Sequence, residues 1–429
     1  MHNLHANGRL CMMYSKGQAK PFRLLSVIIY AGLLAYGTLY PLHDWRVPLE
    51  SGWLPIFGHG SKVSYSDIFT NIVVYIPLGF LLARAVISRS PIGKIIAALL
   101  GGTVLSFLLE SLQVYLPSRV SSFLDLALNT TGALAGGLLF VAVRPQGRIY
   151  ECLLSLRQAH IRPGALASAS MFLLGLWGLS QTSPWVPSLD ISGLRQELKP
   201  LWYTLTQQIP LDFNQMVVYI LTIMALGTVG AAALKSDKSA FWWFAVFISA
   251  VLLFKIPVVG RPLSAEALAG AGVGVVGFAL LRQLPARGAI VSSIVAILGA
   301  VIIDELRVGT TWLISNFNWI PFKGHLTSTV IGIVDTLIGA WPFFALSILV
   351  LHLRPQRPRR ILVWGGIGVF VGMFTLEWNQ QYIAGRYPDI TDAVLALLAW
   401  WLPWFYTPLR QEIRRHHYPD LKGNLRESG

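Results

Sequence analysis

The segment ESLQVYLPSRVSSFLDLALNTTG, residues 110–132, is the most informative in the chain, because it places strongly polar side chains inside sequence that is otherwise highly apolar. Apolar runs lie on both sides of Pro117, which marks a short turn between them. The segment therefore predicts two antiparallel helices joined by a tight turn. Ionisable groups at membrane depth are costly and usually face a bundle interior or a water-filled cavity.

The polar side chains of this segment fall on two helix faces. Glu110 and Gln113 are three residues apart and share a face of the first helix, while Asp125 and Asn129 are four residues apart and share a face of the second. The tight turn brings these faces together. Arg119, in the turn, can reach either carboxylate with a bidentate geometry that Lys cannot offer.

The same frame recurs at residues 377–392, EWNQQYIAGRYPDITD. In both segments Gln lies three, Arg nine and Asp fifteen residues after Glu. The second set is therefore Glu377, Gln380, Arg386 and Asp392. Two copies at one spacing argue against chance and predict a shared role.

Composition predicts a polytopic membrane protein. The chain has 429 residues, of which 54% are hydrophobic and 13% are charged, whereas soluble domains carry roughly 25% charged residues. The formal charge of +14 lies mainly in short loops between apolar stretches. That distribution is typical of membrane orientation and not of a basic face on a soluble domain, so the expected partner is the lipid bilayer and not nucleic acid.

An all-α transmembrane bundle is the expected fold, since a span needs about 20 apolar residues. We predict about twelve transmembrane helices, near residues 22–40, 67–87, 93–116, 121–143, 164–182, 213–234, 240–257, 263–283, 288–306, 327–352, 360–383 and 389–408.

The distribution of Lys and Arg predicts that both termini are cytoplasmic. The opposite orientation would export the cluster Arg354, Arg357, Arg359 and Arg360, against the positive-inside bias. With cytoplasmic termini, both polar segments lie at the outer face. Asp304, Glu305 and Arg307 are then expected to form a solvated helix end.

Twelve helices divide into three groups of four. The predicted organisation is an N-terminal tail (1–21), three four-helix units (22–143, 164–283 and 288–408) and a basic C-terminal tail (409–429). The middle unit is degenerate: Lys255 and Arg261 parallel Gln113 and Arg119, but Leu252 stands at the position of Glu110.

The candidate ligand-binding residues include a further polar stripe on the helix at 67–87, where Asp67 and Asn71 are one turn apart. The full set is Asp67, Asn71, Glu110, Gln113, Arg119, Asp125, Asn129, Glu377, Gln380, Arg386 and Asp392. The alternative is structural, with Arg119 neutralising the two carboxylates and pinning the hairpin. Oxygen ligands alone, without His or Cys support, do not predict a metal site or another cofactor.

Two motifs resemble the VanZ-like family of bacterial membrane proteins. They are SDIFTNIVVYIPLGF at Ser66–Phe80 and the segment Glu110–Gly132, with a further NWIPF at Asn318–Phe322. The third unit departs from the pattern, because Ala396 and Ala399 replace its Asn and Gly. The resemblance implies a multi-pass protein of the bacterial inner membrane with a role in the cell envelope. The family name comes from an accessory protein linked to glycopeptide resistance.

Three functions are compatible with these residues. We expect outer-face polar pockets that bind a lipid-linked glycan, a peptidoglycan precursor or a glycopeptide-type ligand. A membrane enzyme using a Glu–Asp pair in acid–base chemistry is the second candidate, although no nucleophile motif such as GxSxG is present. A transporter is the third, but its site would normally lie near the bilayer midplane.

Overall fold

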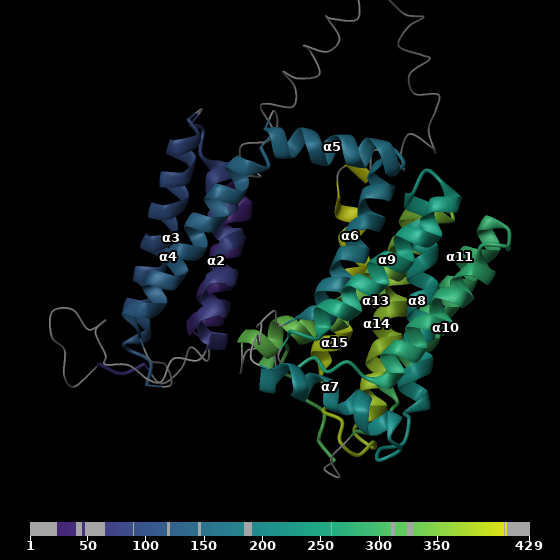
Figure 1. Ribbon diagram of the computed structural model, residues 1–429. Helices are drawn as coiled ribbons and strands as arrows, with labels where there is room; N and C mark the ends of the chain where they lie inside the picture. The colour runs from purple at the N-terminus through teal and green to yellow at the C-terminus, as the bar shows by residue number, and fades with distance from the viewer. Residues whose placement is uncertain are drawn as a thin grey trace, which may run out of the picture. The chain divides into compact units, whose positions relative to one another are not determined.

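The computed structural model describes residues 24–39, 45–47, 65–88, 90–117, 121–144, 147–183, 191–258, 260–309, 314–323, 329–406 and 408–409. These residues form helices and no β-strand (Figure 1). The all-α expectation is thereby confirmed for this part of the chain.

A helix lies at each of the twelve predicted positions, with ends within a few residues of those expected. They are the helix Leu24–Leu39, α2 (Tyr65–Ala85), α3 (Pro91–Gln113), α4 (Phe123–Ala142), α6 (Ala165–Thr182), α8 (Phe213–Ala233), α9 (Asp237–Lys255), α10 (Ala265–Leu281), α11 (Ala286–Glu305), α13 (Thr329–His352), α14 (Pro358–Gln380) and α15 (Ile390–Phe405). Two further helices, α5 (Arg148–His160) and α7 (Ile191–Leu205), lie in connections. Both mix charged with apolar residues, so a search for apolar runs does not find them.

Several helices have the length and composition of membrane spans. The described residues include seven such segments: Ile68–Ala85, Pro91–Gln113, Phe123–Ala142, Phe213–Ala233, Ala286–Glu305, Asp335–His352 and Pro358–Gln380. Four apolar helices are shorter: Leu24–Leu39, Ser239–Lys255, Ala265–Leu281 and Ile390–Phe405. This is a helical membrane protein.

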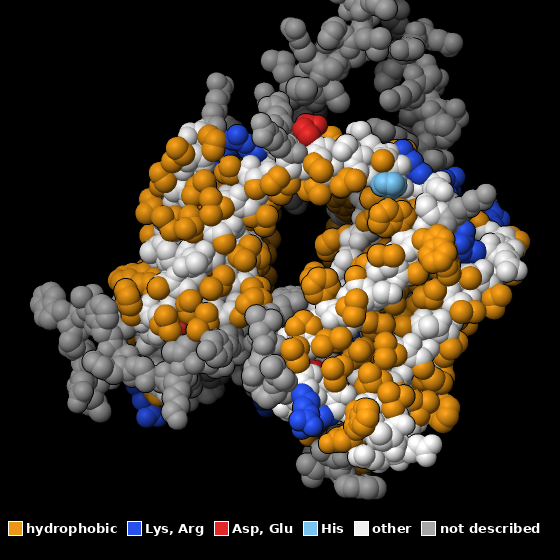
Figure 2. All heavy atoms as spheres, viewed as in Figure 1, with side chains coloured by type: hydrophobic (Ala, Val, Ile, Leu, Met, Phe, Trp, Pro, Cys, Tyr) orange, Lys and Arg blue, Asp and Glu red, His pale blue; other side chains and the backbone are white. Residues whose placement is uncertain are grey.

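The side chains of α3 are arranged inside out relative to those of a soluble protein. Gly102, Ser106 and Glu110 are buried, whereas Leu100 and Val104 are each 58% exposed. Figure 2 shows hydrophobic side chains covering the flanks of the helices. Small and polar residues inside with large apolar residues outside suit helices surrounded by lipid, where close backbone contact replaces the hydrophobic effect.

The chain forms two compact units, Met1–Ser155 and Leu156–Gly429. In the first, α4 packs against both α2 and α3. A Cβ atom at Gly132 would overlap the carbonyl oxygen of Ile72, and one at Gly136 that of Ile76. Two glycines four residues apart therefore allow the backbones of α2 and α4 to touch.

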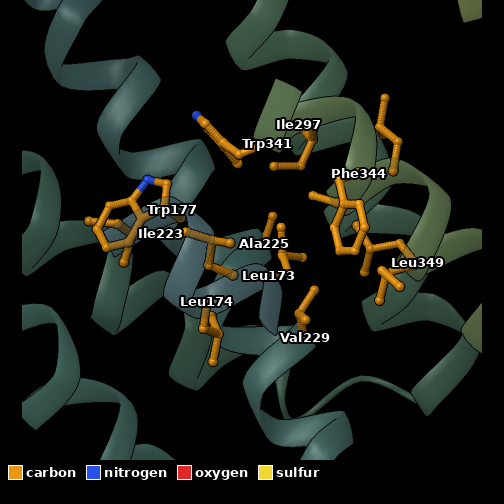
Figure 3. Close-up of a cluster of buried hydrophobic side chains, with 14 of the residues drawn as sticks. Leu173, Leu174, Trp177, Ile223, Ala225, Val229, Ile297, Trp341, Phe344 and Leu349 are labelled. Atoms are coloured by element: carbon orange, nitrogen blue, oxygen red, sulfur yellow. The ribbon is translucent and has the colours of Figure 1, made fainter. Parts of the chain in front are cut away.

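The second unit encloses the middle and third predicted groups of helices in one core. α8 packs against α6, α10 and α11, and α13 packs against α6, α11 and α15. Figure 3 shows part of this core, which includes Leu173, Trp177, Ile223, Val229, Ile297, Phe344 and Leu349. Helices of the two groups thus bury one another's apolar faces, and the division into three units stays a prediction.

Candidate functional site

The turn between α3 and α4 is held by a buried carboxylate. Ser122 is the N-cap of α4, and its side chain accepts a hydrogen bond from the backbone N–H of Leu124 at 3.2 Å. Glu110, which is 3% exposed, accepts the backbone N–H of Ser122 through Oε2 at 3.0 Å. The carboxylate therefore satisfies a backbone donor at the start of a helix, where donors lack helical partners.

A second carboxylate joins α2 to α4. Asn71 Nδ2 donates to Asp125 Oδ1 over 2.6 Å. Asp125 lies in the first turn of α4, where a negative charge is favoured by the helix dipole. The predicted stripe on α2 thus meets the polar face of α4 at Asn71.

Two amides complete the arrangement. Asn129 Nδ2 donates to Ser106 Oγ at 3.0 Å, which connects α4 to α3. Gln113 Nε2 donates to the carbonyl oxygen of Thr38 at 3.2 Å, near the end of the helix Leu24–Leu39. The six residues Asn71, Ser106, Glu110, Gln113, Asp125 and Asn129 are called the first polar cluster below.

Two of the three amide oxygens in the first polar cluster have no hydrogen-bond partner among the described residues. Gln113 Oε1 and Asn129 Oδ1 are both unpartnered, in side chains that are 8% and 6% exposed. The orientation of the Gln113 amide is set by Thr38, because a carbonyl oxygen can only accept. A buried polar atom without a partner costs about 1–3 kcal/mol, so these oxygens mark places where a donor is missing.

Two of the predicted site residues cannot be placed in this cluster. Arg119 lies outside the described residues. The backbone of Asp67 is part of α2, but its side chain lies outside the described part of the chain.

The segment after α14 repeats the arrangement around Glu110. Glu377, 1% exposed, accepts the backbone N–H of Asp389 through Oε2 at 2.9 Å, and Asp389 is the N-cap of α15. In both places twelve residues separate the Glu from the N-cap. Helices α3 and α14 also agree in length, at 23 residues, and each begins with Pro. The same spacing therefore yields the same hydrogen bond.

A third acid, Glu305, joins the second set. Gln380 Nε2 donates to Glu305 Oε2 at 2.7 Å and to Glu377 Oε1 at 3.1 Å. The expectation that residues 304–307 form a solvated helix end is wrong for Glu305, whose carboxylate is held by Gln380. Its partner is 75 residues away in the sequence, so no local pattern could have found it. We call Glu305, Glu377 and Gln380 the second polar cluster.

Among the described residues, the direct hydrogen bond of the Arg386 side chain goes to a backbone carbonyl and not to a carboxylate of the second polar cluster. Its Nε donates to the carbonyl oxygen of Arg307 at 2.8 Å, just beyond the end of α11, and its Nη2 is buried without a partner. Among the described residues it forms no ion pair with Glu377 or Asp392. Asp392 instead faces Gly339 of α13, where a Cβ would lie 3.6 Å from its Oδ1. Arg386 thus holds a helix end.

In the middle predicted group of helices, other residues hold the corresponding turn and helix end. Leu252 is buried at the position of Glu110, and the turn after α9 is held from α7 by Glu197, which accepts the backbone N–H of Gly260 at 2.8 Å. Arg261 Nε donates to the carbonyl oxygen of Ser183, directly after α6. Lys255 Nζ donates to Tyr219 Oη at 3.2 Å. Glu197 has no counterpart in the repeated motif, which explains why the sequence pattern missed it.

These clusters offer hydrogen-bonding groups and buried acids. Within the described part of the chain, no three His, Cys, Asp or Glu side chains are grouped so that they could hold a metal ion. The arrangement can bind a polar group by hydrogen bonds or hold a proton on a carboxylate.

Comparison with known proteins finds a family that is similar to part of the chain. Residues 24–144 match the family VanZ/LLP1. Neither the curated proteins nor the solved structures contain a match to this chain. The matched region runs from the helix Leu24–Leu39 to the end of α4 and contains the first polar cluster. Over residues 24–144, this protein is therefore similar to the VanZ/LLP1 family.

Proposed function

We propose that this protein is a multi-pass protein of the bacterial inner membrane with twelve spans and cytoplasmic termini. Its first polar cluster lies toward the outer face and binds the polar head of a lipid-linked glycan or a peptidoglycan precursor. The observation that carries this proposal is the pair of unpartnered amide oxygens, Gln113 Oε1 and Asn129 Oδ1, in buried side chains.

The chemistry of the first polar cluster favours a ligand that donates hydrogen bonds. Gln113 Oε1, whose orientation is fixed by the Thr38 carbonyl, is an acceptor, and so is Asn129 Oδ1 while its amide donates to Ser106. The carboxylates of Glu110 and Asp125, when ionised, only accept. Sugar hydroxyl and amino groups supply donors, whereas a phosphate diester supplies only acceptors. The described residues of the cluster therefore suit the glycan of a lipid-linked precursor better than its phosphate.

The surroundings of the cluster favour a ligand that carries a lipid chain. Leu108 and Leu112, each two residues from Glu110 on α3, are 52% and 42% exposed. Their side chains lie on the outer side of the same helix whose inner side carries Glu110 and Gln113. A ligand could then contact both surfaces of α3, with its lipid chain on the surface that faces away from the other helices and its polar head at the surface that faces them.

The test compares two lipids that share a polyprenyl chain. Purified protein in detergent is titrated with a polyprenyl phosphate and with the same chain carrying a disaccharide-pentapeptide, while the thermal unfolding midpoint is followed. We expect the glycan-bearing lipid to raise the midpoint and the phosphate to leave it nearly unchanged, because ligand binding to the folded state stabilises it. Equal stabilisation by both lipids would contradict the proposal.

Matched variants identify the site. Gln113→Leu and Asn129→Leu remove the unpartnered oxygens, and each should weaken binding of the glycan-bearing lipid about fivefold, the equivalent of one ordinary hydrogen bond of about 1 kcal/mol. Asn379→Leu is the control, since Asn379 is exposed and donates only to the backbone of Thr375 in its own helix. Wild-type affinity in both cluster variants would place the ligand elsewhere.

A further inference from the structure

Helix α5 has an apolar stripe that the described protein leaves uncovered. Ile149, Leu153 and Leu156 lie at positions i, i+4 and i+7 of the helix and are 51%, 54% and 53% exposed. This spacing puts them on one face. Glu151 and Gln158 lie on the opposite face and are also exposed. The helix is amphipathic, and its apolar face lacks a protein partner among the described residues.

Length excludes α5 as a membrane span. Its 13 residues extend about 20 Å at 1.5 Å per residue, less than the hydrocarbon thickness of about 30 Å. Charged residues at Arg148, Glu151 and Arg157 also oppose insertion across the bilayer. An amphipathic helix of this kind instead lies in the plane of the membrane surface.

The C-terminal end of α5 is fixed to the connection between α8 and α9. Lys235 N donates to His160 O at 2.9 Å, and Arg162 N donates to Ala233 O at 2.8 Å. The His160 ring lies 5.5 Å from that of Trp243, which is 51% exposed near the start of α9. Tryptophan is enriched at membrane–water interfaces, so this contact favours such an interface as the level of this end of α5.

Basic side chains surround this end. Arg157, Arg162 and Lys235 are all exposed, and α5 contains a single acidic residue, Glu151. The head groups of cytoplasmic leaflets carry negative charge, which attracts basic segments next to a span. Charge and apolar stripe therefore fit one partner, an anionic phospholipid surface.

We propose that α5 lies in the head-group layer of the cytoplasmic leaflet, with Ile149, Leu153 and Leu156 among the acyl chains and its basic end bound to anionic phospholipids. The choice of leaflet rests on the cytoplasmic termini proposed above, whereas the surface position of α5 depends neither on that orientation nor on the ligand of the first polar cluster. It assigns α5 a role as a surface anchor in the connection between the VanZ/LLP1 region and the rest of the chain.

Spin labels on the two faces of α5 test its position. With both native cysteines replaced by Ser, a nitroxide is attached at Leu153→Cys or Gln158→Cys in the full-length protein in vesicles. We expect the label at 153 to collide mainly with oxygen, which concentrates in lipid, and the label at 158 mainly with a water-soluble nickel chelate. Equal exposure of both labels to the chelate would overturn the proposal, and so would a label at 153 shielded from both reagents, which would show packing against protein.

Charge-matched variants then test the stripe and the lipid. With only Cys11 replaced, a label on native Cys152 reports the depth of the helix. Leu153→Asp should reduce its oxygen collisions, whereas Gln158→Asp, with the same charge on the opposite face, should not. Vesicles with about a quarter phosphatidylglycerol should draw the label deeper than phosphatidylcholine alone, and Arg157→Gln should weaken that difference. If neither Leu153→Asp nor phosphatidylglycerol changed the depth of the Cys152 label, the proposal of a surface anchor would be refuted.

Discussion

Among single residues, the buried acids Glu110 and Glu377 bind backbone groups at the start of a helix. Glu110 and Glu377 each accept the N–H of an N-cap residue at 3.0 and 2.9 Å. A Glu twelve residues before the cap can do this because the preceding helix ends between them and the chain reverses. The structural explanation for these acids is thus a cap on the turn, and it leaves the amide oxygens of the first polar cluster for a ligand.

Replacing Glu110 by two different residues separates capping from charge. Glu110→Gln keeps a carbonyl oxygen that can accept the Ser122 N–H, so protein level and unfolding midpoint should change little. Glu110→Leu leaves that N–H unpartnered and should cost about 1–3 kcal/mol, measured by denaturant unfolding of the purified protein. Equal stability of the two variants would show that the hydrogen bond to Ser122 contributes little.

Asp212, the N-cap of α8, should make stability depend on pH. Its burial raises the pKa, but hydrogen bonds from the Gln215 N–H and from Arg307, at 3.0 and 3.1 Å, outweigh this and lower the pKa below the usual Asp value. Because the pKa of Asp212 is lower in the folded state than in the unfolded state, the ionised carboxylate stabilises the folded protein at pH values above the usual Asp pKa of about 3.9. This contribution is lost as the pH falls through the folded-state pKa.

Arg307→Gln tests this dependence. The variant should lose stability relative to the wild type near neutral pH, and the difference should shrink in acid, as followed by the unfolding midpoint from about pH 6 down to pH 3. The exposed Arg359 supplies the control, Arg359→Gln. A difference that stays constant with pH would show that the Arg307–Asp212 pair does not set the pKa.

At the scale of helices, close backbone contact positions the first polar cluster. Gly136 lets α4 approach α2 at Ile76, and this contact aligns Asp125 with Asn71 farther along the same pair of helices. Helix pairs in lipid depend on such small residues, since burial of apolar surface contributes little there.

Gly→Ala substitutions at two helix positions should have opposite effects. In Gly136→Ala the new methyl group overlaps the Ile76 carbonyl and should destabilise the protein by about 1–3 kcal/mol. In Gly372→Ala on α14 nothing lies within 4 Å, so the higher helix propensity of Ala should be neutral or stabilise by up to about 1 kcal/mol. Thermal unfolding measures both. Similar losses in the two variants would refute the close contact between α2 and α4.

For the whole molecule, the orientation in the membrane determines whether the polar clusters are accessible from the outside or from the cytoplasm. The basic connections favour cytoplasmic termini, which puts the α14–α15 turn outside. Tyr387 in that turn is 67% exposed and so offers a position for labelling.

Cysteine labelling tests this orientation. In a Cys11→Ser, Cys152→Ser background, Tyr387→Cys should react with an impermeant maleimide in cells whose outer barrier has been removed. Arg359→Cys, at the start of α14, should react only after lysis. The reverse pattern would invert the topology, and the first polar cluster would then face the cytoplasm.

The sequence by itself located twelve helices and picked out polar residues of α3 and α4 that the structure places in the first polar cluster. Both depend on local information: the length of an apolar run, and the spacing of side chains three or four residues apart. The equal spacing in the two Glu segments likewise predicted one arrangement, and Glu110 and Glu377 hold their turns in the same way.

The groups that complete these sites depend on the packing of helices that lie far apart in the sequence. Glu305 meets Gln380 across 75 residues, Glu197 meets Gly260 across 63, and Gln113 meets Thr38 across 75. This packing also places helices of the middle and third predicted groups in one core. Such contacts depend on how helices pack, and a buried donor or acceptor takes whichever partner the packing brings within about 3 Å, wherever that partner lies in the sequence.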